Sequence, residues 1–114
     1  MLEPHILENN SQLNEIIDLS KNPNKNGVLV FKHSTRCSVS YMAFKGLKSQ
    51  WSFDGVDFFY LDLIKFREVS NAIEEMFGVK HESPQLLHIK NGKCTNNASH
   101  FNVNTDTIEN WLNA

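Results

Sequence analysis

Cys37 is the residue whose surroundings point most clearly to chemistry. It follows the apolar run Gly27–Lys32 and precedes a stretch with helical periodicity, so it is expected at a strand-to-helix junction. The N-terminus of a helix offers unpaired N–H groups and a partial positive charge, and both stabilise a thiolate. Lys32, His33 and Arg36 are expected to add positive charge nearby. These features predict a reactive thiol, and the alternative is a half-buried cysteine that serves only as a small apolar residue.

Ser40 occupies the place of the second cysteine in a Cys-x-x-Cys motif. A hydroxyl at this position can hydrogen-bond a thiolate, but it cannot close an intramolecular disulfide. The chemistry of Cys37 is therefore expected to be monothiol. Ser38 and Ser40 can also cap the helix, and this role is compatible with the first.

Ser83 and Pro84 directly precede a third expected strand, Gln85–Lys90. A proline is tolerated there because it comes before the ladder pairing begins. From the residues alone an ordinary trans peptide bond is favoured at Pro84, since only about 5–6% of X-Pro bonds in folded proteins are cis.

The other thiol and the histidines carry weaker signals. Cys94 falls in the last expected strand, away from the helix that Cys37 begins, so a packing or bystander role is expected. The five histidines form no recognised zinc spacing with either cysteine, and no metal site is predicted. His33 and His81 could approach Cys37 and tune it, although an ordinary surface histidine is the safer interpretation for each.

The chain has 114 residues, of which 40% are hydrophobic and 21% charged, and this composition is typical of one globular domain spanning residues 1–114. A formal net charge of -2 provides no global field that would favour nucleic acid or an anionic membrane. The longest apolar run, Val28–Phe31, is far too short to cross a bilayer. The N-terminal residues do not resemble a secretory signal, so two free cysteines and a cytoplasmic location are expected.

The elements that must position these residues follow from hydrophobic periodicity and turn signals. They are a helix from Asn10–Ser11 to Lys21, a strand 27–32, a helix 39–51, a strand 56–63, a helix 66–77 that stops at Gly78, strands 85–90 and 93–99 around an Asn91-Gly92 turn, and a final helix capped near Asn104–Thr105. The order combines a right-handed parallel crossover with an antiparallel hairpin. It predicts an α/β fold, a mixed four-stranded sheet flanked by helices in the order α-β-α-β-α-β-β-α.

Two segments carry a family resemblance, which spans roughly residues 10–113: Thr35-Arg36-Cys37-x-x-Ser40 after the first strand, and His81-Glu82-Ser83-Pro84-Gln85 before the hairpin. With this order of elements the chain resembles the monothiol bacilliredoxins, thioredoxin-like proteins first described as general stress proteins of the YtxJ type. The resemblance implies a thioredoxin fold, the reactive cysteine at Cys37 and a cis-proline at Pro84 packed beside it. Family members commonly have proline after the cysteine, whereas this chain has Ser38, a departure expected to alter local rigidity and thiol tuning.

The resemblance further implies the substrate, which is a protein in mixed disulfide with bacillithiol, a low-molecular-weight thiol of many Gram-positive bacteria. The Cys37 thiolate would attack the bacillithiol sulfur and free the client cysteine, and a second thiol would regenerate the enzyme. Bacillithiol is then a co-substrate, and no bound cofactor is implied. Arg36 and Lys32 could attract its carboxylates, and the backbone of Ser83 could pair with an extended ligand; for Lys32 a solvated charge is the alternative.

Two functions of other classes remain open at this point. A thioredoxin-like binding module would recognise partners at the surface around Cys37 and Pro84 without turnover. Iron–sulfur cluster carriage is a weaker possibility, because some monothiol glutaredoxin-like proteins place one cysteine at this position. The scattered glycines form no phosphate loop or dinucleotide motif, so nucleotide-dependent catalysis is not expected.

Overall fold

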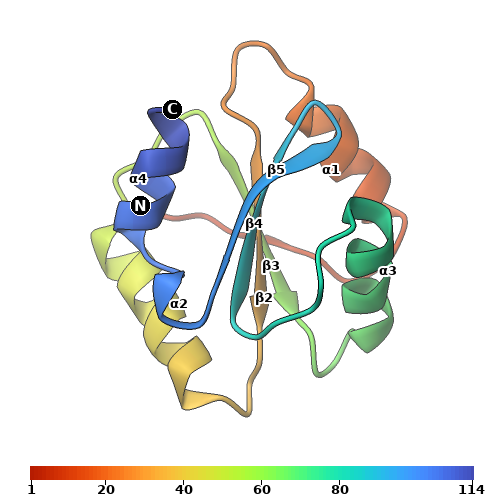
Figure 1. Cartoon of the computed structure of the whole chain (residues 1–114), viewed down its shortest axis with the longest axis vertical. Helices are drawn as coiled ribbons and strands as arrows, with labels where there is room; N and C mark the ends of the chain where they lie inside the picture. Colours follow the sequence, from red (N-terminus) through yellow and green to blue (C-terminus); the bar gives the residue numbers. More distant parts are fainter.

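The computed structural model describes residues 1–114 and contains five strands and four α-helices (Figure 1). In chain order the elements are β1 (His5–Ile6), α1 (Gln12–Ser20), β2 (Val28–His33), α2 (Ser38–Gln50), β3 (Asp57–Asp62), α3 (Arg67–Phe77), β4 (Gln85–Lys90), β5 (Lys93–Ser99), the 3-10 helix η1 (His100–Asn102) and α4 (Thr105–Leu112). The α/β class and the mixed sheet flanked by helices are confirmed.

The strands are ordered β1-β3-β2-β4-β5, so β2 lies at the centre of the sheet. β2 runs parallel to β3 and antiparallel to β4, and Lys32 near the end of β2 pairs with Gln85 at the start of β4. The chain after β2 and the chain before β4 therefore meet at the same edge of the sheet. Cys37 lies in the first of these segments and Pro84 ends the second.

The sheet has one strand more than the four expected from the sequence. The additional strand is the two-residue β1, in which His5 pairs with Phe59 and Ile6 with Tyr60 of β3. The next residue, Leu7, donates its N–H to the Tyr60 carbonyl at 2.9 Å and is fully buried. Two residues are too few to show a strand period, so β1 leaves no hydrophobic pattern in the sequence.

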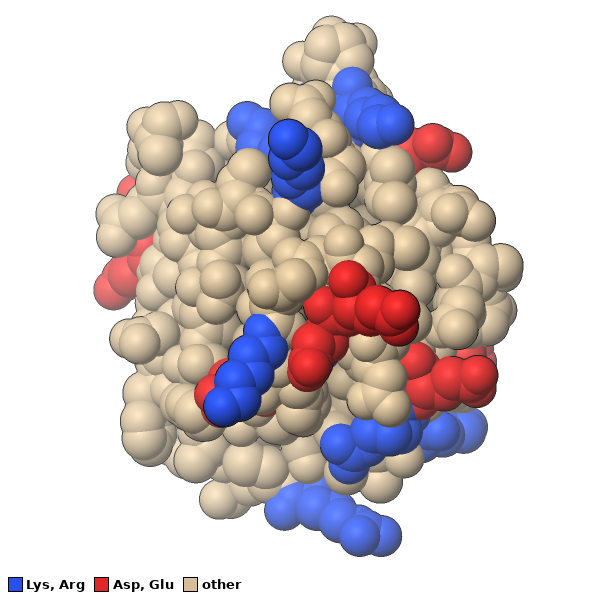
Figure 2. Space-filling view, turned by 45° about the vertical axis from the view of Figure 1, so that its right-hand side comes forward, with Lys and Arg blue, Asp and Glu red and all other residues tan.

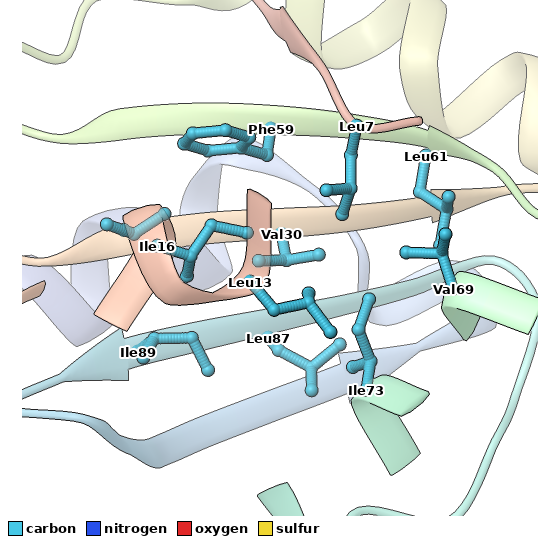
Figure 3. Close-up of a cluster of buried hydrophobic side chains, with 11 residues drawn as sticks. Leu7, Leu13, Ile16, Val30, Phe59, Leu61, Val69, Ile73, Leu87 and Ile89 are labelled. Atoms are coloured by element: carbon cyan, nitrogen blue, oxygen red, sulfur yellow. The ribbon is translucent and has the colours of Figure 1, made fainter. Parts of the chain in front are cut away.

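Two hydrophobic clusters lie on the two faces of the sheet. One packs beneath α1 and α3 and includes Val28 and Val30 (Figure 3), and the other packs beneath α2 and α4 and includes Leu29 and Phe31. Figure 1 shows α1 and α3 on one side of the sheet and α2 and α4 on the other. Since alternate residues of a strand face opposite sides, β2 is buried on both faces, as its continuous apolar run predicted.

Turn and cap signals agree with the backbone geometry. Asn91 and Gly92 have φ angles of 52° and 78°, which is the pair of positive values that a type I′ hairpin turn requires. At the start of α4, the Asn104 side-chain oxygen accepts the N–H of Thr107 at 2.9 Å. Both features were predicted from residue type and position.

Candidate active site

Cys37 is the N-cap residue of α2. Its backbone is extended, with φ −119° and ψ 119°, and its carbonyl accepts the N–H of Tyr41 at 3.2 Å. The thiol is free and partly exposed. No side chain caps the helix, so the capping role expected for Ser38 and Ser40 is not found. The N–H groups of the first turn are therefore left without a side-chain acceptor beside this thiol.

Ser34 holds the loop between β2 and α2. Its carbonyl accepts the N–H of Cys37 at 3.2 Å, its hydroxyl accepts the N–H of Arg36 at 3.3 Å, and its own N–H is bonded to Ser40. Sequence reasoning did not single out Ser34. A serine that stands between a buried strand and the turn at Thr35 and Arg36 is the local signal that could have identified it.

Ser40 is fully buried, and its hydroxyl is bonded to two groups other than the thiol. Oγ accepts the Ser34 N–H at 3.0 Å and lies 2.7 Å from Nδ1 of His33. Burial is the main cause that lowers the pKa of His33, while the charge of Asp62 opposes the shift. No hydrogen bond joins the Ser40 hydroxyl to the sulfur of Cys37. The expected bond to the thiolate is thus absent in this structure.

Arg36 is the only one of the three expected positive charges that remains exposed near Cys37. Lys32 has no exposed surface, and its Nζ donates to the Ser70 carbonyl at 3.2 Å. Burial lowers the pKa of Lys32 to about 8, with Arg67 lowering it further and Glu74 opposing the shift. The expectations that Lys32 is a solvated charge or attracts carboxylates at the surface were both wrong, because Lys32 continues the row of Val28 and Val30 into the layer beneath α3.

Pro84 lies directly before β4, and the peptide bond between Ser83 and Pro84 is cis. The trans bond favoured from residue type alone was wrong, and the cis-proline implied by the family resemblance is confirmed. Pro84 is buried, and its carbonyl accepts the N–H of His100 at 2.9 Å. The main-chain N–H and C=O of Ser83 make no hydrogen bond within the molecule, and its hydroxyl is buried without a partner. Ser83 thus presents an unpaired stretch of backbone at the edge where Cys37 lies.

Cys94 lies near the other end of the hairpin, where it pairs with Ile89. Its Sγ donates to the Asn96 carbonyl at 3.2 Å, and burial raises the pKa of this thiol even though the hydrogen bond to Asn96 opposes the shift. Ile89 lies four positions along β4 from Gln85, which corresponds to about 13 Å along an extended strand. These positions support the interpretation of Cys94 as a packing residue.

Neither of the two histidines expected near the site is an exposed surface residue. His33 is buried beneath α2, with 1% of its surface exposed, so the surface interpretation was wrong for it. His81 is partly buried, and its Nδ1 lies 3.4 Å from the Ser70 hydroxyl. Burial, together with the charges of Lys32 and Arg67, lowers the pKa of His81.

The surface of the molecule shows no bias toward one sign of charge on the face drawn in Figure 2. Acidic side chains gather near its middle, and basic side chains lie above and below them. No three His, Cys, Asp or Glu side chains come together as a possible metal-binding group. None of the helices combines the length and the apolar character that a membrane span requires.

Solved structures share this arrangement of sheet and helices. The thioredoxin of Trypanosoma brucei brucei is 13% identical with a TM-score of 0.75, covering 97% of this chain and 88% of that one. The thioredoxin of Fasciola hepatica is 16% identical with a TM-score of 0.73, and 96% of each chain is covered. At this identity the likeness shows the fold alone. The fold is that of thioredoxin, and the Cys-x-x-Ser sequence at the start of α2 makes the molecule a monothiol variant of this class.

A further structure, of a protein proposed to be an oxidoreductase with a thioredoxin fold, is 28% identical. Its TM-score is 0.75, and the match covers 93% of this chain and 90% of that chain. Residues 5–108 match the model of the monothiol bacilliredoxin BrxC family. The chain therefore belongs to this family of thiol–disulfide oxidoreductases.

Proposed function

We propose that this protein removes bacillithiol from S-bacillithiolated proteins and that Cys37 is the nucleophile. The observation that carries the proposal is the place of Cys37, a free and partly exposed thiol at the N-terminus of α2 with a serine three residues later. Membership of the monothiol bacilliredoxin family supports bacillithiol as the thiol that is transferred. A cytoplasmic location belongs to the proposal, because regeneration by a free thiol needs a reducing compartment.

The reaction consists of two thiol–disulfide exchanges. The Cys37 thiolate attacks the bacillithiol sulfur of the client mixed disulfide, and the client sulfur leaves with the electron pair and takes up a proton. A disulfide between Cys37 and bacillithiol remains. A second bacillithiol, as thiolate, then attacks the bacillithiol sulfur of this disulfide, which releases oxidised bacillithiol and restores the Cys37 thiolate. Ser40 has no thiol with which to resolve the intermediate internally.

The residues around Cys37 have distinct roles in this proposal. Arg36 supplies an exposed positive charge next to the thiol. The free N–H and C=O of Ser83 pair with the backbone of an extended client segment, as an added strand pairs with a sheet edge. Pro84 keeps this backbone at the edge beside the loop of Cys37, and the exposed Ser38 lies in the first turn of α2, where it borders the incoming disulfide.

Intact mass spectrometry tests the proposal directly. Reduced protein is mixed with a bacillithiol-modified client, and we expect one bacillithiol adduct on the wild type together with a released client thiol. Cys37→Ala should abolish both products, whereas the matched variant Cys94→Ala should behave as the wild type does. Absence of transfer by the wild type, or an adduct on Cys94, would contradict the proposal. Client capture without any transfer of bacillithiol would instead favour a binding module.

A further inference from the structure

A pocket of about 500 Å³ lies on the side of α2 that faces β3, and the site described above does not use it. Its volume is in the range of small-molecule sites. Tyr60 of β3 contributes to it, whereas Pro84 directly precedes β4 on the other side of β2, so the pocket and the cis-proline lie on opposite flanks of α2. We call it the α2 flank pocket, and its walls include His33, Tyr41, Phe44, Lys45, Lys48 and Tyr60.

Aromatic rings that pack against one another form the wall of the α2 flank pocket. The ring centroids of Phe44 and Tyr60 are 4.9 Å apart, and those of His33 and Tyr60 are 5.4 Å apart. The edge of Tyr41 meets His33 at 4.9 Å and 86°. His33 is in turn held by Ser40 through its Nδ1. Because each ring is positioned by its neighbours, the pocket exists before any ligand binds.

The polar groups around the pocket are donors without partners in the molecule. The hydroxyls of Tyr41 and Tyr60 make no internal hydrogen bond, and Lys45 and Lys48 are exposed and form no ion pair. Lys48 Nζ lies 4.6 Å above the ring of Phe44, which places its charge at the pocket. Such a set of donors favours an anion.

The other titratable groups near the pocket do not reverse this preference. Burial is the main cause that raises the pKa of Tyr60, with Asp62 and Tyr41 adding to it, so its hydroxyl keeps its proton at neutral pH. Asp62 is the acidic side chain acting on this region, and its Oδ1 accepts the N–H groups of Ile64 and Lys65 in the turn after β3. Its carboxylate forms no ion pair with Lys45 or Lys48, so both lysine charges stay free for a ligand.

The spacing along α2 connects this pocket to the reactive thiol. Cys37, Tyr41, Phe44 and Lys48 stand at i, i+4, i+7 and i+11, which places them in one stripe along the helix. At a rise of 1.5 Å per residue, Lys45 lies about 12 Å and Lys48 about 16 Å along the axis from Cys37. A small elongated molecule joined to Cys37 through its sulfur could therefore extend along this stripe to the lysines.

We propose that the α2 flank pocket binds the carboxylate-bearing end of the low-molecular-weight thiol while its sulfur is exchanged at Cys37. Lys45 and Lys48 would meet the carboxylates, and the tyrosine hydroxyls would bond polar groups of the ligand. The aromatic wall would pack against its ring. This inference rests on the proposed function and extends it, because it assigns recognition of bacillithiol, a carboxylated aminosugar thiol, to a surface apart from the client groove at Ser83.

Transfer rates measured on two substrates test the inference. One client protein is prepared as its mixed disulfide with bacillithiol and, separately, with 2-mercaptoethanol, which has no carboxylate. Replacing two charged donors by Lys45→Gln and Lys48→Gln together should slow transfer from the bacillithiol client by about tenfold or more. Transfer from the 2-mercaptoethanol client should stay unchanged. The control is the double variant Lys21→Gln and Lys93→Gln, which removes two exposed lysines that form no ion pair and should affect neither rate.

Equal slowing of both substrates, or no slowing of the bacillithiol substrate, would overturn the inference. Failure of the proposed function has a different signature, namely no transfer from either client by the wild type. Binding of S-methyl bacillithiol to Cys37→Ala, followed by NMR, decides the inference in that event. Shifts of the His33 and Tyr41 ring signals that are lost with Lys45→Gln and Lys48→Gln would support it, and absence of binding would overturn it.

Discussion

At the scale of single residues, the two neighbours Lys32 and His33 at the end of β2 explain most of the difference between the expected and observed site. Both are basic and both precede the reactive cysteine. Both are also buried, each on a different face of the sheet. Lys32 bonds a carbonyl of α3, and His33 bonds Ser40 in α2. Neither contributes an exposed charge beside Cys37, which leaves that role to Arg36.

Replacement of Lys32 by methionine should stabilise the protein at neutral pH. A folded-state pKa of about 8, compared with 10.5 for an exposed lysine, means that the amine is protonated in both states at pH 7 and is buried at a cost of about 3 kcal/mol. Lys32→Met should therefore raise the free energy of unfolding by about 1–3 kcal/mol at pH 7. Urea unfolding at several pH values measures this difference.

The pH dependence of that gain provides the check. Between pH 8 and 10.5 the unfolded wild type binds more protons than the folded one, so wild-type stability rises with pH over this window. The advantage of Lys32→Met should shrink accordingly. A gain that is independent of pH would show that packing and not charge is responsible. Lys21→Met, at an exposed position, should change stability by no more than about 0.5 kcal/mol.

At the scale of elements, the loop between β2 and α2 is held by serine side chains and not by a helix cap. Ser40 is part of α2, yet its hydroxyl is bonded to the last residues of the strand side, Ser34 and His33. Ser34 is in turn bonded to Arg36 and Cys37. The position of the reactive thiol therefore depends on contacts that join the strand end to the first turn of the helix.

Ser40→Ala should destabilise the fold by about 1–3 kcal/mol, because it leaves the buried N–H of Ser34 and the buried Nδ1 of His33 without a partner. Ser38→Ala is the matched control, since Ser38 is exposed and makes no side-chain hydrogen bond. It should change stability by no more than about 0.5 kcal/mol. Thermal or urea unfolding measures the free energy of unfolding of both variants. Equal destabilisation by Ser40→Ala and Ser38→Ala would contradict the assignment of these bonds to Ser40.

At the scale of the whole molecule, the N-terminal segment completes the sheet and adds a buried leucine to each of the two cores, Leu2 beneath α2 and α4 and Leu7 beneath α1 and α3. β1 pairs with β3 through only two residues, and its own side chains are exposed. The following Leu7 is fully buried in the cluster beneath α1 and α3, which includes Val30 and Leu61 (Figure 3). The segment is thus held by buried apolar side chains as much as by its backbone pairing.

Leu7→Ala should lower the free energy of unfolding by about 2–5 kcal/mol, the range for removing a buried leucine side chain. The adjacent Ile6→Ala removes an apolar side chain that is 51% exposed and should cost much less. Urea unfolding of the two variants compares a buried and an exposed position in the same segment. Similar losses for both would show that the burial of Leu7 does not anchor the N-terminus.

Hydrophobic periodicity and turn chemistry were sufficient to predict most elements. The bounds of β4 and β5 were predicted without error, and α1, β2, α2, β3, α3 and α4 were placed within one or two residues at most ends. These features depend on residues that are close in sequence, such as Asn91-Gly92 or the Asn104 cap. β1 and η1 were not predicted, because two or three residues carry no period.

The sequence by itself determined the order of the four helices and of the strands β2 to β5, the location of a thiol at the start of a helix and the absence of a second cysteine three residues later. Tertiary structure decided which face of the sheet receives Lys32 and which receives His33, and so which charges remain near that thiol. It also decided that the segments of Cys37 and Pro84 share an edge and that Tyr60 joins α2 in forming a pocket. The reason is physical: local patterns reflect neighbours along the chain, whereas burial, hydrogen-bond partners and pockets depend on elements distant in sequence that pack together.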